Sequence, residues 1–422
     1  MGVRSTEQSA GTNIAGYERH ENFMSGRISR NLIYILLLMG LLGLSGCGSP
    51  SSASMETSSE APSEVTRAAE TTQEEQTELV KTGSMELQYA ENFAVDYYED
   101  GYKMLTTLPD SKRYLLVPEG QPVPRGLDED VSILQEPLQK IYLVASGVMD
   151  MFASVDAVDQ IRFSGQKQEN WYIQTAKDAM AAGDMIYAGK YSKPDYELLV
   201  SEGCDLAIEN RMITHSPEVV EMLQSFDIPV MIEYSSYEKH PLGKVEWVKF
   251  FGALIGKEVE AEEAFAQQTE ILEEVESGEK TGKTIAFFYV TSNGLIQVRQ
   301  STDYIPKLIE LAGGRYIFED LEDSGSGRST LNMQVEDFYA GAKDADILIY
   351  NSSIDGGVTT LDELIGKCNI LKDFKALQEG QVYCTTNDMY QQSMAIGYLL
   401  QDMHTVLTDD DTAKLRYLFL LQ

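Results

Sequence analysis

The chain has 422 residues, 67 of them acidic and 33 basic, and its formal net charge is −34. This length exceeds what one hydrophobic core usually organises, so we expect two lobes. The negative charge would repel phosphate backbones, which argues against nucleic-acid binding. The cysteines at 47, 204, 368 and 384 are too few and too scattered for a disulfide scaffold or a Cys-x-x-Cys metal site, although a Cys368–Cys384 pair stays open.

Segment 1–46 has the pattern of an export signal. A basic start precedes an apolar run of about a dozen residues, which is too short to span a bilayer. The run closes on LSGC at 44–47, which resembles a bacterial lipobox, in which the cysteine thiol receives a diacylglyceryl group. The sequence therefore predicts a signal peptide and lipid on Cys47, with an ordinary signal as the alternative. Met24 starts a better-proportioned signal than Met1 and is the alternative start.

Segment 47–86 is rich in Ser, Thr and Glu and contains few large apolar side chains. Such a composition cannot bury enough surface to offset the entropy of ordering. We expect a lipidated, disordered tether.

Residues 87–243 are expected to form an N-terminal α/β lobe. A hairpin opens it, with strands over 102–107 and 113–118 around Pro109-Asp110-Ser111. Strand-like runs at 140–145, 160–163, 206–209 and 229–233 then alternate with helical ones at 147–152, 174–180 and 217–226. This alternation predicts a mainly parallel sheet with helices on both faces, in which ligands sit beyond the carboxyl ends of the strands.

A helical pattern covers 244–278, with apolar residues on one face and an acidic end. About 30 residues at about 1.5 Å each would reach roughly 45 Å, which is longer than one small domain needs. The sequence predicts a single connector helix. A second alternation of strands and helices over 279–422 predicts a C-terminal α/β lobe of the same kind.

Two runs carry a resemblance to a known family. AGKYSKPDYELLVSEGCDLAIEN at 188–210 and VEDFYAGAKDADILIYN at 335–351 each place a glutamate on a helix before an aspartate and a strand. With the plan of two lobes and one helix, they resemble the substrate-binding lipoproteins of ABC importers for iron–siderophore complexes, haem and cobalamin, over roughly 102–407. The resemblance implies a monomeric protein, not an enzyme, that is lipid-anchored outside the cytoplasm. It would carry a metal chelate as transported ligand and no permanent cofactor.

In that family a surface glutamate on each lobe pairs with arginines of the permease dimer, because a carboxylate accepts a bidentate guanidinium contact. The resemblance assigns this role to Glu197, eight residues before Asp205, and to Glu336, ten residues before Asp346. Asp337 is the alternative to Glu336. Each glutamate could equally be an ordinary solvated helix residue.

The candidate ligand-binding residues lie on loops that follow predicted strands. Aromatic faces suit planar or hydrophobic cargo, and arginine suits the carboxylate or catecholate oxygens of a ferric chelate. Core packing is the alternative for the aromatic residues, a surface ion pair for the first arginine and a turn role for the histidine. The candidates are Ser146, Trp171, Tyr191, Arg211, Tyr234, Glu238, His240, Arg299, Tyr304 and Tyr390.

Two other functions compete with chelate binding. A zinc- or manganese-binding protein of the same plan needs three or four converging ligands, whereas the histidines after Cys47 are only His215, His240 and His404. A surface enzyme lacks a motif: no Gly-x-Ser-x-Gly is present, and the glycines of ESGEKTGKT at 276–284 do not have phosphate-loop spacing. The residues do not choose among haem, cobalamin and ferric siderophores.

Overall fold

The computed structural model describes residues 79–321, 329–352, 357–409 and 411–422. The predicted signal peptide, Cys47 and most of the predicted tether lie outside these residues. The end of the tether prediction is wrong, because Lys81–Ser84 forms strand β1 and pairs with β2.

The first lobe, residues 79–240, opens with a five-stranded sheet in the order β1-β2-β3-β4-β5. Neighbouring strands are antiparallel, except that β4 and β5 are parallel. The strands are β1 (Lys81–Ser84), β2 (Phe93–Tyr98), β3 (Lys103–Thr107), β4 (Lys112–Val117) and β5 (Val131–Gln135). The predicted hairpin is confirmed as β3 and β4. The sequence did not predict a separate antiparallel sheet around it.

The second sheet of the first lobe is wholly parallel, in the order β12-β11-β6-β7-β8. Its strands are β6 (Ile141–Leu143), β7 (Ile161–Ser164), β8 (Ile186–Tyr187), β11 (Leu206–Asn210) and β12 (Val230–Glu233), and its helices are α1 (Val148–Ser154), α2 (Gln174–Ala182), α3 (Tyr196–Glu202) and α4 (Pro217–Ser225). A small hairpin, β9 (Gly189–Lys190) and β10 (Lys193–Pro194), precedes α3. Leu206 and Ile208 of β11 belong to one buried cluster and Ala207 to another, so both faces of this sheet are covered, as predicted.

The second lobe, residues 284–422, contains one mixed sheet in the order β16-β14-β13-β17-β18-β19, with β15 also paired to β13. Strands β13, β15, β17 and β18 are parallel, and β14, β16 and β19 are antiparallel to their neighbours. The strands are β13 (Thr284–Val290), β14 (Ile296–Arg299), β15 (Arg315–Tyr316), β16 (Thr330–Met333), β17 (Ile347–Tyr350), β18 (Val382–Thr385) and β19 (Leu418–Leu420). The helices are α7 (Tyr304–Leu311), α8 (Val335–Ala342), α9 (Leu361–Lys367), α10 (Lys375–Gln378) and α11 (Ile396–Thr408).

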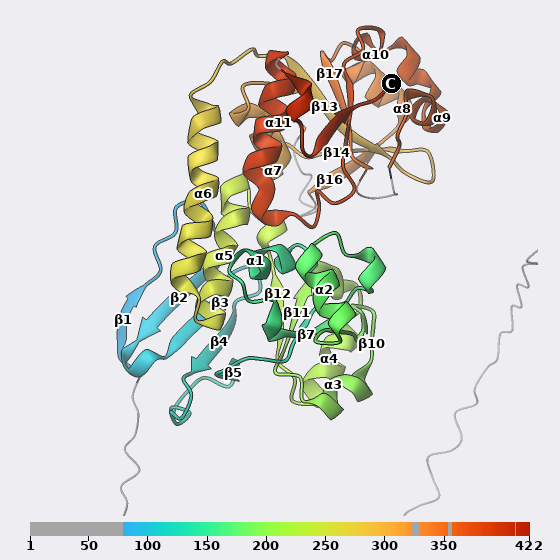
Figure 1. The fold of residues 1–422 in the computed structure, drawn as a ribbon. Coiled ribbons are helices and arrows are strands. Elements are labelled where there is room, and N and C mark those ends of the chain that lie inside the picture. The colour runs from blue at the N-terminus through green and yellow to red at the C-terminus, as the bar shows by residue number, and fades with distance from the viewer. Residues whose placement is uncertain (1–78, 322–328, 353–356, 410) are drawn as a thin grey trace, which may run out of the picture. The chain divides into compact units, whose positions relative to one another are not determined.

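The prediction of one continuous connector helix is wrong. Two helices, α5 (Pro241–Ile255) and α6 (Glu258–Glu276), run side by side as a helical hairpin (Figure 1). Gly256, with φ of 71°, ends α5 in the left-handed conformation that glycine adopts without strain. The helices approach closely at Gly252, where an added Cβ would lie 2.5 Å from Cβ of Ala261.

The helical hairpin packs against both lobes. Helix α5 contacts α1, β2 and β3 of the first lobe and α7 and α11 of the second, and α6 contacts α7 and α11. The rings of Phe93 on β2 and Trp247 on α5 pack in a T-shaped arrangement, with 5.0 Å between their centroids. One buried cluster extends from Phe93 through Trp247 to Ile285 of β13, so a single core joins the two lobes.

Candidate ligand-binding site

A hollow of about 300 Å³ lies between loops of the two lobes. This is at the lower end of the range for small-molecule sites. Its lining comes from the first lobe, the helical hairpin and the second lobe. We call this hollow the cleft, and its lining residues are 145–147, 210–212, Glu233, 235–237, Lys244, Arg299, Tyr304, Ser329, Met389 and Tyr390.

The first-lobe side of the cleft lies at the carboxyl ends of three adjacent parallel strands. Ser146 follows β6, Arg211 follows β11, and Tyr237 follows β12. The side chain of Asn210 accepts a hydrogen bond from the backbone of Met212, which fixes the turn after β11. The Arg211 guanidinium lies over the ring of Tyr237, 4.5 Å from its centroid. This is the place where open α/β sheets bind ligands.

The second-lobe side contains a tightly held arginine. Arg299 ends β14, and its guanidinium forms an ion pair of 3.4 Å with Asp303 and faces the ring of Phe287. The Tyr316 hydroxyl accepts a hydrogen bond from the Arg299 backbone N–H and donates one to its carbonyl. Burial raises the pKa of Asp303, and the charge of Arg299 opposes that rise. Arg299 therefore balances a buried carboxylate as well as lining the cleft.

An aromatic pair from both lobes stands beside the cleft. Tyr390, which is 37% exposed, meets the ring of Tyr172 edge-on at 6.4 Å between centroids. The buried amide of Gln391 accepts a hydrogen bond from Tyr172 N and donates to Asn170 O and to the Tyr390 hydroxyl. These bonds attach the loop after β18 to the first lobe.

The charge of the cleft lining is opposite in sign to that of the whole chain. Among the residues that the structure describes, Arg211, Lys244 and Arg299 line it and Glu233 is the one carboxylate, in a protein with formal charge −34. Glu233 is itself bound by the backbone and hydroxyl of Ser235, and burial raises its pKa. The lining therefore suits an anionic group of a ligand.

The structure brings together five of the predicted ligand-binding residues, namely Ser146, Arg211, Arg299, Tyr304 and Tyr390. Trp171 does not line the cleft; it is buried in the core and donates a hydrogen bond from Nε1 to Ser164 Oγ. Tyr191 lies between β9 and β10 and packs against the buried cluster of the first lobe that contains Ala207.

Three further candidates, from segment 234–240, have structural positions. Tyr234 is buried beside Tyr237. His240 caps α5, accepts a hydrogen bond from Leu242 N at Nδ1 and stacks on Tyr89. Glu238 is buried and accepts hydrogen bonds from Trp247 Nε1 and from the backbone of residues 91 and 92.

The sequence interpretation missed several lining residues, above all Glu233, Tyr237 and Lys244. A search of the strand ends and the loops that follow them could have found both Glu233 and Tyr237. Glu233 is the last residue of β12, and Tyr237 lies in the loop after it. Lys244 gives a different signal, since it is a lysine within the otherwise mainly apolar first turns of α5.

The two predicted docking glutamates are both solvent-exposed. Glu197 is the second residue of α3, which precedes β11, and Glu336 is the second residue of α8, which precedes β17. Asp337, the alternative, is also exposed but one position further along α8.

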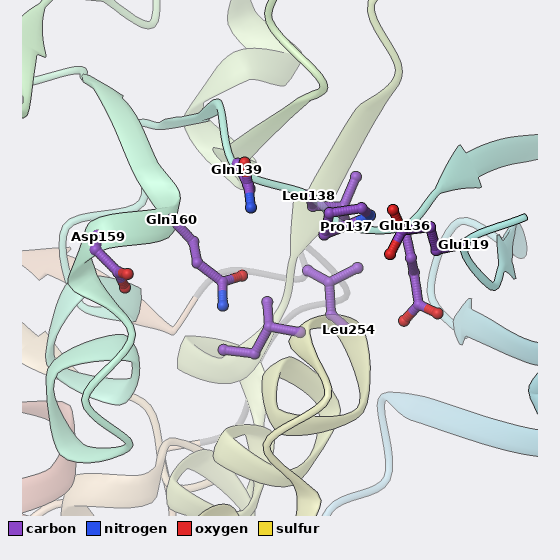
Figure 2. Close-up of a pocket in the computed structure, with 9 residues that line it drawn as sticks. Glu119, Glu136, Pro137, Leu138, Gln139, Asp159, Gln160 and Leu254 are labelled. Atoms are coloured by element: carbon purple, nitrogen blue, oxygen red, sulfur yellow. The ribbon is translucent and has the colours of Figure 1, made fainter.

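A larger hollow, of about 610 Å³, lies elsewhere (Figure 2). Figure 2 shows Glu136, Pro137 and Leu138 on the segment between β5 and β6, together with Leu254 of α5. Gln139 and Gln160 of its lining precede β6 and β7. This hollow is therefore at the amino ends of the parallel strands, whereas such sheets bind ligands at the carboxyl ends, so the cleft is the candidate site.

Within the described ranges, no three His, Cys, Asp or Glu side chains come together as possible metal ligands. Cys204, Cys368 and Cys384 are not joined in disulfides, so the open Cys368–Cys384 pair is not formed in this structure. None of the helices that the structure describes combines the length and apolarity needed to cross a membrane.

The chain has the fold of the periplasmic substrate-binding proteins of ABC importers. Similar solved structures include a possible iron-binding periplasmic solute-binding protein from Staphylococcus epidermidis, with TM-score 0.50, 16% identity and coverage of 64% of this chain and 98% of that one. The periplasmic haem-binding protein HutB of Vibrio cholerae has TM-score 0.51 and 14% identity, with coverage of 63% of this chain and 98% of that one. The petrobactin-binding protein YclQ of Bacillus subtilis has TM-score 0.50 and 13% identity, with coverage of 64% of this chain and 92% of that one.

Sequence comparison finds relatives that align with this chain over most of their length. Two proteins of Methanocaldococcus jannaschii, both named uncharacterized lipoproteins, are 24% identical over 351 residues and 23% identical over 371 residues. These alignments cover 76% of this chain and 81% of the first relative, and 85% of this chain and 90% of the second. No family model matches the chain.

Proposed function

We propose that this protein is an extracytoplasmic solute-binding lipoprotein that captures a metal chelate with anionic oxygens and delivers it to an ABC permease. The observation that carries the proposal is the charge of the cleft, where three cations and one carboxylate among the described residues line a hollow in a chain of formal charge −34. A cationic lining in an acidic protein attracts an anion that the rest of the surface would repel.

The side chains that line the cleft limit the classes of ligand that would fit it. Arg211 can present its fork of N–H donors to carboxylate, catecholate or phosphate oxygens. Tyr237 and Tyr390 are partly exposed aromatic residues of the same lining, at 40% and 37% exposure. Aromatic faces with a guanidinium suit a ligand that has both a flat apolar part and anionic oxygens. A ferric siderophore or haem fits this description, and cobalamin remains in the same class of cargo.

The similar solved structures support the same class of cargo. Their names describe proteins that bind iron, haem and petrobactin. The two Methanocaldococcus jannaschii relatives are named lipoproteins, which supports lipid on Cys47 and a location on the outer face of the cell membrane. The exposed glutamates Glu197 and Glu336, one in each lobe, are proposed to dock a permease dimer, and the protein is proposed to act as a monomer without a permanent cofactor.

Tyrosine and tryptophan fluorescence of the purified protein tests the proposal. Titrations would compare haemin, cobalamin, a ferric catecholate and a ferric hydroxamate with free Zn²⁺ and Mn²⁺. Saturable quenching by a metal chelate at micromolar concentration or below, and no response to the free ions, is the expected result. Saturation by a free ion alone would favour the ion-binding alternative instead.

A further inference from the structure

Helix α5 buries three charged side chains, and two of them are neutralised within the protein. Lys244, Glu246 and Lys249 are 7%, 0% and 4% exposed. The Glu246 carboxylate accepts hydrogen bonds from the backbone N–H groups of residues 88, 89 and 90. Lys249 forms ion pairs with Glu246 at 3.5 Å and with Glu262 at 2.8 Å. The protein thus satisfies the charge of Glu246 and Lys249 with its own groups.

Lys244 is different. Its ammonium forms no ion pair or hydrogen bond with any residue that the structure describes, and it lies over the ring of Tyr304, 4.9 Å from the centroid. Lys244 and Tyr304 both line the cleft, and both also line a much smaller void next to it. The ammonium therefore sits at the boundary between the cleft and the core.

Three carboxylates are close enough for Lys244 to lower their pKa values, namely Asp150, Glu233 and Asp303. Each of them is already bonded to other groups: Asp150 to Met394 N, Glu233 to Ser235, and Asp303 to Ile305 N and Arg299. Burial raises the pKa of all three. These carboxylates moderate the charge of Lys244 at a distance, but none provides the direct contact that a buried ammonium requires.

We propose that Lys244 is a specificity-determining residue, whose ammonium binds an anionic oxygen of the ligand at the floor of the cleft. The inference rests on the proposed function, because it assigns a contact to the same ligand. A carboxylate, phosphate or catecholate oxygen supplied by the ligand would give the ammonium a direct partner that the described residues do not provide. Lys244 then selects ligands by the position of a negative oxygen, while Arg211 lies nearer to the solvent-exposed Tyr237.

The test compares Lys244→Met, Lys244→Gln and Lys244→Arg with the wild-type protein and with Lys249→Met. Lys249 is the matched control, since it lies on the same helix, is equally buried and does not line the cleft. Calorimetric titrations would use ferric citrate and haemin, which carry free carboxylates, and an uncharged ferric trishydroxamate. Thermal unfolding would be measured for each variant.

The inference predicts that Lys244→Met and Lys244→Gln fold and lose about 10- to 100-fold in affinity for the carboxylate-bearing chelate, because a charge-assisted contact is removed. Lys244→Arg should keep most of this affinity, and Lys249→Met should lower the unfolding temperature without changing affinity. Binding of the uncharged chelate, where it occurs, should respond little to any of them.

Two results would overturn the inference while leaving the proposed function intact. The first is tight wild-type binding of a carboxylate-bearing chelate that Lys244→Met and Lys244→Gln leave unchanged. The second is failure of both variants to fold where Lys244→Arg folds, which would make Lys244 a counter-ion of the buried carboxylates. If the wild-type protein binds none of the chelates, the proposed function fails and the inference fails with it.

Discussion

Asp205 and Asp346 occupy equivalent positions in the two lobes. Asp205 directly precedes β11 and accepts a hydrogen bond at Oδ2 from Lys140 N, the residue before neighbouring strand β6. Asp346 directly precedes β17 and accepts one at Oδ2 from Thr284 N, where neighbouring strand β13 begins. In both lobes an aspartate therefore ties the start of one parallel strand to the start of the next.

This equivalence extends to the helices that precede the aspartates. Glu197 and Glu336 are each the second residue of their helix. The spacing from glutamate to aspartate is eight residues in one lobe and ten in the other, because α8 is one residue longer than α3 and the link that follows α8 is also one residue longer. Helix position thus favours Glu336 over Asp337 as the counterpart of Glu197.

The docking proposal predicts that ligand binding and uptake can be separated. Glu197→Arg combined with Glu336→Arg should abolish uptake in cells that carry the cognate permease, because like charges would then face the permease arginines. Ligand affinity should be unchanged, since neither residue lines the cleft. Glu221→Arg with Asp362→Arg is the control pair, also exposed, and should retain uptake. A loss of ligand affinity in the first double variant would contradict the assignment.

The two arginines of the cleft should respond differently to replacement by alanine. Arg211→Ala removes a partly exposed cation that packs on Tyr237, so affinity for an anionic chelate should fall about 10-fold or more while stability changes by about 1 kcal/mol or less. Arg299→Ala leaves the buried carboxylate of Asp303 without its cation and should cost about 3 kcal/mol of stability. Chemical denaturation and calorimetric titration of each variant measure both effects. A stability loss of about 1 kcal/mol or less in Arg299→Ala would show that Arg299 is not a structural counter-ion.

Glu209 predicts a pH dependence of stability. Its side chain is fully buried in β11, its carboxyl oxygens have no hydrogen-bond partner among the described residues, and burial raises its pKa from 4.5 to about 8. At a pH between 4.5 and about 8, the Glu209 carboxyl keeps its proton in the folded protein and loses it in the unfolded chain. Stability should therefore fall as the pH rises from about 4.5 to about 8 and fall no further above that range.

Glu209→Gln removes this titration while keeping the shape of the side chain. The variant should match the wild type at pH about 5 and exceed its free energy of unfolding at pH about 9 by on the order of 3 kcal/mol. Denaturant titrations at both pH values measure the difference, and Glu218→Gln, at an exposed site on α4, is the control. The same stability difference at both pH values would mean that Glu209 does not carry the proton.

Lipid attachment predicts where the protein is found in the cell. Cys47→Ala should shift the protein out of the membrane fraction or leave it unprocessed, because the thiol that accepts lipid is gone. Fractionation and mass spectrometry of the N-terminal peptide measure this outcome. Cys204→Ala, at a free thiol of the folded part, is the control and should stay with the membrane. Unchanged processing and membrane retention of Cys47→Ala would contradict the prediction.

The parallel sheet of the first lobe was predictable because each of its main strands is a short apolar run followed by a helical pattern. The helical hairpin was not, since α5 and α6 read as one helix unless Gly256 is recognised as a C-terminal cap. The five-stranded sheet was also only partly predictable. Its strands β1 and β5 have mostly exposed or half-buried side chains, so their sequences lack a clear apolar alternation.

The candidate site was likewise predictable from the sequence only in part. Arg211 and Tyr390 were predicted as lining residues because they lie on loops that follow strands. Such loops lie together at the carboxyl edge of a parallel sheet, so their position in the sequence is enough to indicate them. Trp171 also follows a strand, but its side chain points into the core, a direction that depends on tertiary packing. Lys244 reaches the cleft from a helix, which a rule based on strand ends does not cover.

Calorimetric titration of the wild-type protein and Arg211→Ala with haemin, cobalamin, ferric siderophores, Zn²⁺, Mn²⁺, sugars and amino acids tests the central claim most directly. The account predicts one-to-one binding of an anion-bearing metal chelate, weakened about 10-fold or more by Arg211→Ala, because a charge-assisted contact in the cleft is lost. Tight binding confined to a free ion, a sugar or an amino acid would contradict it.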